Sequence, residues 1–574
     1  MSRAPDLATQ ARDNSRPRRP LFPARKRLFM ASLLFAFLFP YATWKQAAGC
    51  ALLLLLFDTL ILPWLDFDVS KGTVVGRGTG ATASGLSQPP PGLLVNKEGG
   101  TWIPAGHAYP APTANGRTGI ILYPISVLAL IALYRNHLHI AAAAWAMMAL
   151  GDGMATVIGL RCGGDLPSGL MAHADADSGC AAPTCGKPLA FQPVPRASSS
   201  CALAGRLSLP ASAEEIVQGP PPSARRSLSA SRAAEPQHLG TLPWNRLRTL
   251  PGFISFAVAG TVGAYLLTRW IAPEIPPPKT LMVCAAASLL GAVFESFPIA
   301  LDDNITVPLV VGAFMFCAYL VERSALDSNL PYLGRRIALA IAVNLAFALL
   351  ACALKAATRS GAVCGFLLGT AIYLGYGYKS FFLLFAFVLL GSAATRLGFA
   401  KKAARGVAEQ RGGARSWREA LANIVAAAFF AILVITTHHE AAFLIALVAA
   451  LAEAAGDTVS SEIGQWASDR AYLITTFKLV PAGEDGGISL PGTVAGFAAS
   501  AIIMGLSLGL GLCGPYRFAG PAIALGAAGV GNLFDSLLGA TIQRRGLLTN
   551  GMVNFAGTSV AGALALGLAL GLGL

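Results

Sequence analysis

Long apolar stretches separated by short polar segments constrain the fold of this chain more than any other feature. We count about fifteen of them, and an α-helix of roughly 20 apolar residues is enough to cross a bilayer. Only 13% of the 574 residues are charged, whereas a soluble protein carries about 25%. The stretches are continuous rather than alternating, which argues against a transmembrane β-barrel. The sequence therefore predicts an all-α fold, a polytopic transmembrane helical bundle. The spans are expected near residues 28–43, 47–66, 118–135, 138–160, 252–271, 280–300, 305–322, 335–354, 360–376, 379–398, 421–437, 440–457, 492–513, 518–540 and 552–574.

The charge distribution predicts how the chain is oriented. The net charge is +14, and basic residues gather in the N-terminal tail and in loops beside apolar stretches. This positive-inside pattern places the N-terminus in the cytoplasm. We expect a multi-pass protein of the cell (inner) membrane, with an organelle membrane as the alternative. No nucleic-acid partner is expected, because aromatic residues do not interleave with the charges.

The order of the segments predicts two modules. A basic tail, residues 1–27, precedes a first membrane module, residues 28–330, and a second module covers residues 331–574. Gly-, Pro- and Ser-rich sequence without helical periodicity interrupts the first module at 67–116 and 162–240, which predicts two flexible insertions. We find no clear sequence repeat between the halves.

Four cysteines lie in or next to the second insertion. Their spacing contains no paired CxxC and matches no zinc site, so we predict none there. They are Cys162, Cys180, Cys185 and Cys201.

Polar groups inside apolar segments mark candidate sites in the first half, because a carboxylate in a membrane segment is costly. Adjacent carboxylates and amides are ligands that suit Mg²⁺ together with substrate phosphates. Plain alternatives are a solvated helix end, a juxtamembrane anchor and a solvated turn. The candidates are Gly151-Asp152-Gly153, Asn245, Arg248, Glu295, Asp302, Asp303 and Asn304.

The second half has a denser constellation. Glu453 and Asp457 are four residues apart in one apolar stretch, so they share a helix face, and Glu462 follows. Three intramembrane acids are difficult to explain structurally. Asp485-Gly486-Gly487 forms a glycine-flanked acidic loop whose N–H groups could hold phosphate.

The last two predicted spans carry further polar groups. Asp535 needs a partner, for which Arg396 or Arg359 is available, and Asn550 and Asn554 are spaced to face one cavity. The basic loop at 399–420 is either a topology anchor or a clamp for phosphate groups.

The first half resembles the phytol kinase and dolichol kinase family. The matching pieces are the Gly-Asp-Gly triplet with Ala155 and Gly159, the Leu-Pro-Trp-Asn stretch ending at Asn245, and Glu295 with Asp302-Asp303-Asn304, over about 118–161 and 241–322. The family transfers phosphate from a nucleoside triphosphate, typically CTP, to a long-chain isoprenoid alcohol. Arg248-Thr249 stands where the family usually has Lys followed by Ser or Thr.

The second half resembles the integral membrane family that includes phytyl-phosphate kinase, over about 335–570. The specific pieces are Gly456-Asp457-Thr458 with Ser461-Glu462-Ile463-Gly464, Asp485-Gly486-Gly487, Asp535-Ser536 and Asn550 with Asn554. That family is implicated in converting an isoprenyl monophosphate to the diphosphate.

These resemblances imply an integral membrane lipid kinase that phosphorylates an isoprenoid alcohol, an isoprenyl monophosphate or both. Mg²⁺ is the expected cofactor, CTP or another nucleoside triphosphate the co-substrate, and a membrane isoprenoid the partner. The implied catalytic residues are Asp152, Asp302, Asp303, Asp457 and Asp485. The implied phosphate-binding residues are Gly151, Gly153, Asn245, Arg248, Asn304, Gly486, Gly487 and Arg396. Metal ligands would be Asp302, Asp303, Asp457, Glu462 and Asp535, and substrate contacts Glu295, Glu453, Asn550 and Asn554.

Three alternatives stay open. A CTP-dependent lipid cytidylyltransferase would use the same groups but release pyrophosphate. An ion-coupled transporter would place its acids at mid-bilayer rather than at one membrane face. The first half alone could be a structural module that has lost activity.

Overall fold

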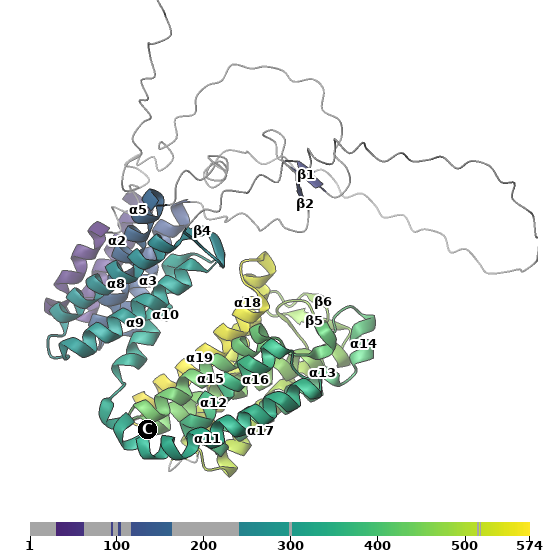
Figure 1. Cartoon of the computed structure of the whole chain (residues 1–574). Coiled ribbons are helices and arrows are strands. Elements are labelled where there is room, and N and C mark those ends of the chain that lie inside the picture. Colours follow the sequence, from purple (N-terminus) through teal and green to yellow (C-terminus); the bar gives the residue numbers. More distant parts are fainter. Residues whose placement is uncertain are drawn as a thin grey trace, which may run out of the picture.

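The computed structural model describes residues 30–61, 93–95, 102–104, 116–162, 240–297, 301–513, 516 and 518–574. The tail 1–27, three of the four clustered cysteines and most of both predicted insertions lie outside these residues. Within the first insertion, β1 (Leu93–Val95) pairs antiparallel with β2 (Trp102–Pro104). The described chain forms two helical bundles (Figure 1).

The first bundle contains the helices that precede the predicted boundary near residue 330. A short β3–β4 pair, Thr241–Leu242 with Asn245–Thr249, precedes α8 at one end. The helices are η1 (Leu33–Tyr41), α2 (Trp44–Leu56), η2 (Phe57–Ile61), α3 (Gly116–Leu133), α4 (Leu138–Ala146), η3 (Met147–Asp152), α5 (Gly153–Cys162), α8 (Leu250–Ile271), α9 (Pro277–Ser296) and α10 (Asp303–Tyr319).

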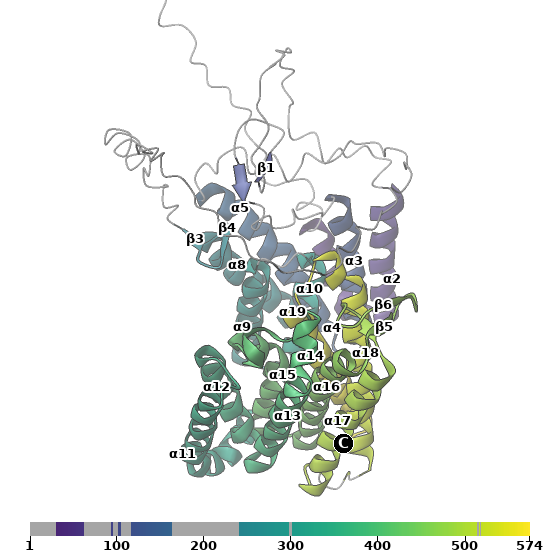
Figure 2. The same cartoon turned by 90° about the vertical axis from the view of Figure 1, so that its right-hand side faces the viewer.

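The second bundle contains all later helices and one small sheet. In that sheet β5 (Arg470–Leu473) lies between β6 (Leu479–Pro481) and β7 (Gly487–Ile488), antiparallel to both. Figure 2 shows two of the later helices, α11 (Arg323–Ala353) and α12 (Arg359–Tyr376), side by side at the edge of the second bundle. The helices are α11 (Arg323–Ala353), α12 (Arg359–Tyr376), α13 (Tyr378–Arg396), α14 (Phe399–Ala404), η4 (Gln410–Gly413), α15 (Trp417–Thr436), α16 (Glu440–Ala467), α17 (Leu490–Gly509), α18 (Ala519–Thr541), η5 (Gln543–Arg545) and α19 (Asn550–Gly571).

Each of the fifteen predicted spans coincides with helix. Among the described residues, ten helices are long and apolar enough to cross a membrane, and shorter apolar helices account for others, such as Asp303–Tyr319. In α11 only 11% of the most apolar window is buried, so its leucines and isoleucines cover the outside of the bundle. Apolar surface of this extent fits contact with lipid. The prediction of an all-α polytopic membrane protein is confirmed.

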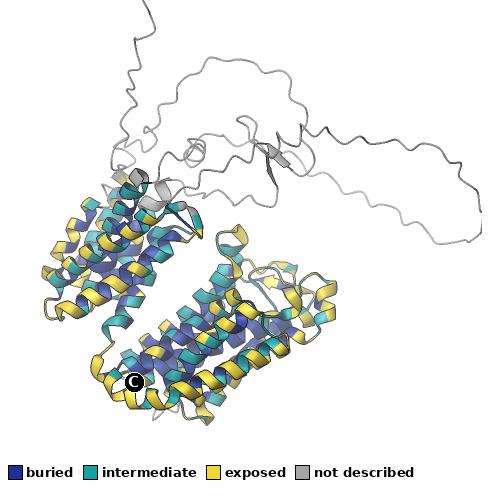
Figure 3. Cartoon of the chain, viewed as in Figure 1, coloured by how far each residue is buried: buried dark blue, intermediate teal, exposed yellow. Residues whose placement is uncertain are grey.

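Each bundle has its own apolar core, coloured dark blue in Figure 3. The central elements are Leu138–Gly159 in the first bundle, whose apolar window is 83% buried, and α16 in the second, 94% buried. These two elements carry Asp152 and Asp457, so the candidate acids lie on the helices that the other helices surround.

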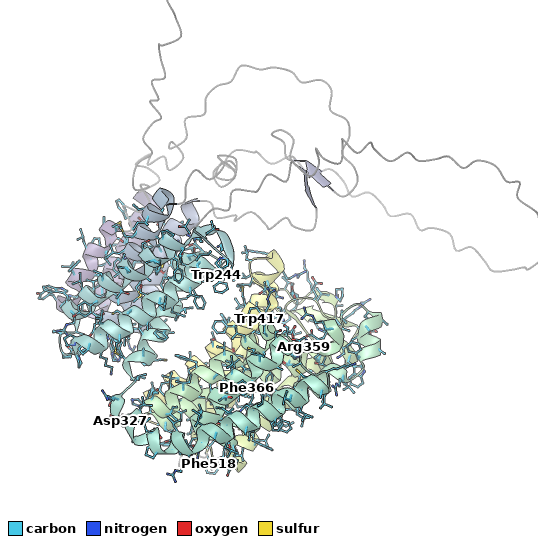
Figure 4. All side chains as sticks on the ribbon, in the orientation of Figure 1. Trp244, Asp327, Arg359, Phe366, Trp417 and Phe518 are labelled. Atoms are coloured by element: carbon cyan, nitrogen blue, oxygen red, sulfur yellow. The ribbon has the colours of Figure 1, made fainter. Side chains whose placement is uncertain are left out.

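The polar ends of both bundles lie on the same side of the membrane if each helix crosses it once. α10 begins at Asp303 and leads to the opposite side, where the N–H of Glu322 donates to the carbonyl of Thr436 at the end of α15. α11 then returns and ends beside Lys355. Figure 4 accordingly places Arg359 and Trp417 at one end of the second bundle and Asp327 and Phe518 at the other.

Candidate functional site

Glu453 lies near the middle of the most enclosed helix of the second bundle. It is the fourteenth of the 28 residues of α16, and its side chain is 1% exposed. Neither carboxylate oxygen has a hydrogen-bond partner among the described residues. Glycines make room for it: a methyl group at Gly531 would lie 2.8 Å from its Cγ, and one at Gly557 would collide with Oε1.

Two further carboxylates lie next to Glu453. Asp457, one turn along α16, interacts electrostatically with Asp535 of α18 and with Arg415. Oδ2 of Asp535 is buried without a hydrogen-bond partner in the described chain. The sequence correctly predicted that Glu453 and Asp457 share one helix, and the structure brings Asp535 to them.

The predicted pairing of Asp535 with Arg396 or Arg359 is wrong. Arg396 ends α13 and donates to the carbonyl of Leu354, 3.2 Å away, while Arg359 is exposed at the start of α12. The cation that acts on the acidic group is instead Arg415, whose guanidinium also contacts Thr395 at 3.2 Å and Glu409 at 3.4 Å.

Glu462 occupies a buried ion pair. Its Oε2 is 2.6 Å from Nζ of Lys402, and its Oε1 accepts from the hydroxyl of Thr395 at 2.6 Å. Lys402 also donates to the carbonyls of Ala394 and Thr395. Sequence reasoning named Glu462 as a metal ligand and placed Lys402 and Arg415 in the basic loop 399–420, without predicting their contacts with Glu462 and Asp457. In this arrangement both oxygens of Glu462 are engaged by the protein, so its evident role is to position Thr395.

The acidic loop after β6 is docked on the end of α18. Glu484 pairs with Arg544 at 2.9 Å, and Asp485 accepts from Nε2 of Gln543 at 2.8 Å. Gly486 has a φ of +70°, and a side chain there would collide with the backbone of Ala540. Burial and the neighbouring Glu484 raise the pKa of Asp485, and Arg544 opposes this rise. The contact with Ala540 explains the glycine at position 486.

The predicted asparagine pair does not act as a pair. Asn550 is exposed at the start of α19, whereas Asn554 donates to Oδ1 of Asn423 on α15 at 3.3 Å. The second asparagine therefore joins α19 to α15 at the same end of the bundle.

In the first bundle, Arg248 joins two predicted carboxylates. Its guanidinium pairs with Glu295, which is 3% exposed at the end of α9, and with Asp303 at 3.0 Å. Asn245 donates to the carbonyl of Ser296 at 2.9 Å, and the indole of Trp244 to the hydroxyl of Ser296 at 3.1 Å. The Trp-Asn-x-x-Arg segment thus fixes the ends of α9 and α10 together.

Asp302 caps a helix. Its carboxylate accepts from the backbone N–H of Asn304, in the first turn of α10, at 3.0 Å and also contacts the side-chain amide of Asn304. Oδ1 of Asn304 is buried without a hydrogen-bond partner in the described residues. The local structure accounts for Asp302, and a role in metal binding remains a prediction.

Asp152 lies deeper, on the central element of the first bundle. It is 8% exposed, and Gly151 beside it abuts the ring of Phe256 on α8, 3.2 Å from where a methyl group would lie. Gly153 faces Met30. An apolar groove of about 490 Å³ begins beside α5 and the first turn of α8. Its lining is Met154, Ile158, Leu250, Pro251, Ile254, Ser255, Val258 and Ala259.

The structure reveals a repeat between the halves that sequence reasoning missed. Gly151-Asp152 is followed by Ile158-Gly159, and Gly456-Asp457 by Ile463-Gly464, with the same spacing. After each helix and its short strands comes Thr/Ser-Leu-Pro-Gly: residues 249–252 in the first bundle and 489–492 in the second.

The repeated residues make the same contacts. Thr249 and Ser489 each cap the following helix through the N–H of Gly252 or Gly492, at 3.2 and 3.3 Å. A methyl group at Gly159 would lie 4.0 Å from Cα of Gly252, and one at Gly464 would lie 3.6 Å from Cα of Gly492. Asp152 and Asp457 therefore occupy equivalent positions, a signal present in the sequence as two short motifs at matched spacing.

No group of three or more His, Cys, Asp and Glu side chains within the described ranges is arranged to hold a metal ion. Asp457 and Asp535 interact electrostatically with each other, and Glu453 with both. The buried, unpartnered oxygens of Asp535 and Glu453 fit a cation, because Mg²⁺ usually binds one or two carboxylates together with substrate phosphates.

Comparison with known proteins identifies the second half. The family model described as integral membrane protein DUF92 matches residues 342–562. An uncharacterised membrane protein of Synechocystis sp. is 34% identical over 204 residues, covering 35% of this chain and 78% of that protein. One from Methanocaldococcus jannaschii is 36% identical over 209 residues, covering 36% and 83%. This chain belongs to the DUF92 integral membrane family.

The DUF92 region also resembles a plant protein. Protein VTE6, chloroplastic, of Arabidopsis thaliana is 36% identical over 216 residues, which cover 36% of this chain and 64% of VTE6. The chain thus spans less than two thirds of that relative. No solved structure matches significantly. The DUF92 match begins within α11, so it contains Glu453, Asp457 and Asp535 but none of the first-bundle candidates.

Proposed function

We propose that the DUF92 module transfers a phosphate group from a nucleoside triphosphate to an isoprenyl monophosphate in the membrane, of the phytyl phosphate to phytyl diphosphate type. The observation that carries this proposal is that Asp457 interacts electrostatically with both Asp535 and Arg415, one helical turn from Glu453 toward the polar end of the bundle. Phosphoryl transfer needs carboxylates for a metal ion and a cation for the transferred group, brought together by positioning.

The residues of the module have distinct parts in this proposal. An oxygen of the lipid phosphate attacks the terminal phosphorus of the nucleotide, the bond to the bridging oxygen breaks, and the nucleoside diphosphate leaves. Arg415, held by Thr395 and Glu409, stabilises charge on the transferred group. Because the attacking phosphate oxygen is already ionised near pH 7, the module needs no strong base.

A magnesium ion bound by Asp457 and Asp535 would neutralise charge on the nucleotide phosphates. Asp485 and the glycines after it would close the same end, since their loop is docked on α18, which carries Asp535. We propose CTP as the phosphate donor, from the family resemblance, and the assay below compares it with ATP.

For the first module we propose phosphorylation of an isoprenoid alcohol. The support is the repeat: Asp152 is the positional equivalent of Asp457, and the apolar groove along α5 and α8 offers a place for a hydrocarbon chain. An alcohol, unlike a phosphate, must lose a proton when it attacks phosphorus, and Asp152 is the base that we assign to it. The monophosphate could then pass to the second module without leaving the bilayer.

One observation favours a transporter as the second candidate. Glu453 lies at half the length of α16 without a hydrogen-bond partner in the described chain, which is where ion-coupled transporters bind their ions. The polar residues around Arg415 and Asp485 at one end of the bundle favour the kinase.

The test uses full-length protein in lipid nanodiscs with Mg²⁺ and CTP or ATP labelled on the terminal phosphate. Phytol and phytyl phosphate are offered separately, and lipid products are resolved by chromatography. Asp457→Asn and Asp535→Asn should lower transfer to phytyl phosphate at least 100-fold, in line with loss of a charged group that stabilises the transition state. Asp152→Asn should abolish transfer to phytol only.

An exposed acid at the opposite end of the second bundle serves as the control. Asp327→Asn should keep wild-type rates. Label on the α-phosphate entering lipid, with pyrophosphate released, would replace the proposal with a cytidylyltransferase. No label in any lipid, together with ion uptake by proteoliposomes that Glu453→Gln abolishes, would replace it with a transporter.

We propose the cell (inner) membrane as the location, with the N-terminus in the cytoplasm. The support is the positive-inside pattern. The name of the VTE6 relative, chloroplastic, supports the organelle alternative instead. Localisation of a fluorescent fusion, with protease protection of the N-terminal tag, separates the two.

A further inference from the structure

A small polar hollow opens at the site end of the DUF92 module, beside the groups described above. It lies between the end of α11, the end of α13 and the turn at 411–413. No carboxylate contributes to its lining, which is formed mainly by Lys355, Ser392, Thr395, Arg396, Gly412 and Gly413. The enclosed space is about 10 Å³, room for one oxygen atom, and two cations and the Ser392 hydroxyl line it. These groups suit one oxygen of a tetrahedral anion whose other atoms lie at the mouth.

Backbone conformation brings the cations and the two glycines to this hollow. Lys355, which follows α11, has a φ of +54°, a position that glycine usually takes at the end of a helix. Arg411, Gly412 and Gly413 follow one another with φ values of +54°, +68° and +84°. Holding a non-glycine residue in this region costs about 1 kcal/mol, so the placement of the Lys355 side chain at the hollow carries a backbone cost.

The polar groups of the hollow have capacity for a ligand. No hydrogen bond or ion pair of the Lys355 ammonium or of the Ser392 hydroxyl occurs among the described residues, while Arg396 uses one N–H on the carbonyl of Leu354. Nothing lies within 4 Å of where a side chain at Gly412 would begin, so the mouth stays open there. The Lys355 ammonium and the Ser392 hydroxyl are therefore available to bind a ligand.

The hollow adjoins the acidic centre. Thr395 lines it and also bonds to Arg415 and Glu462. Gly391, next to Ser392, packs against Thr458, the neighbour of Asp457, with 3.3 Å to the place of a methyl group. An anion held in the hollow would thus lie on the Arg415 side of Asp457.

We propose that this hollow binds a phosphate group, with Lys355, Ser392 and Arg396 as ligands. The inference rests on the proposed function for its choice of ligand: the phosphate belongs either to the lipid monophosphate or to the nucleotide. It adds Lys355 and Ser392 to the residues assigned to the site.

Equilibrium binding to the full-length protein in nanodiscs tests the proposal. The probes are farnesyl monophosphate and, separately, CTP and ATP, each at low ionic strength so that charge contacts are not screened. Lys355→Gln and Arg396→Gln should each raise the Kd at least 10-fold for one class of probe, which corresponds to about 1.4 kcal/mol. Lys355→Arg should restore most of the affinity, because it returns the charge.

The pattern of losses identifies the source of the phosphate. Weaker binding of farnesyl monophosphate alone assigns the hollow to the lipid, and weaker binding of CTP or ATP alone assigns it to the nucleotide. Lys379→Gln, at the other end of α13, is the matched control and should change neither Kd. Unchanged Kd values for all probes in both variants, with melting temperatures like wild type, would overturn the proposal, as would a wild type that binds no probe.

The experiments distinguish a wrong assignment of the phosphate site from a wrong assignment of kinase activity. Phosphate transfer by the wild type with unchanged KM values in Lys355→Gln and Arg396→Gln would refute this site and leave the kinase standing. Binding that depends on Lys355 and Arg396, without any phosphate transfer, would support the phosphate site and refute the kinase.

Discussion

Lys402 and Glu462 form an ion pair that is closed to solvent, with Nζ 2.6 Å from Oε2 and side-chain exposures of 0% and 5%. Two carbonyls and the Thr395 hydroxyl complete the hydrogen bonding of the pair. The pair ties the start of the basic loop to the central helix α16. It therefore fixes the loop from which Arg415 reaches the acidic centre.

Removal of one partner of this ion pair should lower the free energy of unfolding of the protein. Lys402→Met leaves Glu462 as an uncompensated buried charge, a change that costs about 3–5 kcal/mol in comparable cases. We expect a clear fall of the melting temperature in detergent, measured by thiol-reactive fluorescence. Lys401→Met is the matched control, because Lys401 is exposed and, within the described chain, donates to the carbonyl of Trp466 alone. Equal melting temperatures for the two variants would contradict the structural role of the pair.

Arg248 should stabilise the first module in a similar way. Arg248→Gln removes the partner of Glu295, which is 4% exposed, while Arg248 itself is 38% exposed. We therefore expect a smaller cost, about 3 kcal/mol, and only partial recovery in Arg248→Lys, since an ammonium lacks the planar fork that contacts Glu295 and Asp303 together. The measurement is thermal unfolding, with Arg269→Gln, near the far end of the following helix α8, as control. A control as unstable as Arg248→Gln would sink this explanation.

Much of the architecture was predictable because apolar length and intramembrane charge are local features. All fifteen stretches became helix, and Glu453 and Asp457 lie on one helix as their spacing requires. Ion-pair partners were less predictable. Lys402 and Glu462 are 60 residues apart, and a charge inside a basic loop gives no sign that it turns inward.

Two errors have a physical cause. Asp535 was given an arginine partner because an isolated intramembrane carboxylate is costly, yet the structure places it beside Asp457 and Glu453, an arrangement that a bound cation would stabilise. The repeat was missed because its conserved spacing lies in glycines that allow helices to approach, and glycines are frequent throughout this chain.

The acidic loop should make stability depend on pH. The pKa of Asp485 is raised in the folded protein, so the folded state holds this proton more tightly than the unfolded one. Stability from this group is present below the ordinary value of about 3.9 and is lost as the pH rises through the raised pKa. The amide side chain of the Asp485→Asn variant does not titrate. The melting temperature of the variant minus that of the wild type should therefore increase as the pH rises from 4 to 7.

The neighbouring acid provides the control for this effect. Glu484 contributes to the raised pKa, so Glu484→Gln should reduce the difference between Asp485→Asn and its parent, measured by melting curves across the same pH range. A difference that stays constant with pH would show that the docking of the loop, rather than ionisation of Asp485, sets its stability.

The repeated glycine contact predicts a graded response in the two modules. A methyl group at Gly492 would lie 2.6 Å from the carbonyl oxygen of Ser460 and 2.9 Å from Oγ of Ser489, whereas the nearest atoms at Gly252 are 3.1 and 3.2 Å away. Gly492→Ala should therefore cost about 1–3 kcal/mol and Gly252→Ala less, because the carbonyl oxygen and the hydroxyl both lie closer to the added methyl group at Gly492. Gly505→Ala on the same helix α17, with nothing within 4 Å, should be neutral or stabilising by up to about 1 kcal/mol. Melting temperatures that fall in the order Gly505→Ala, Gly252→Ala, Gly492→Ala would support equivalent helix pairs that are packed more tightly in the second module. A lower melting temperature for Gly252→Ala than for Gly492→Ala would contradict this prediction.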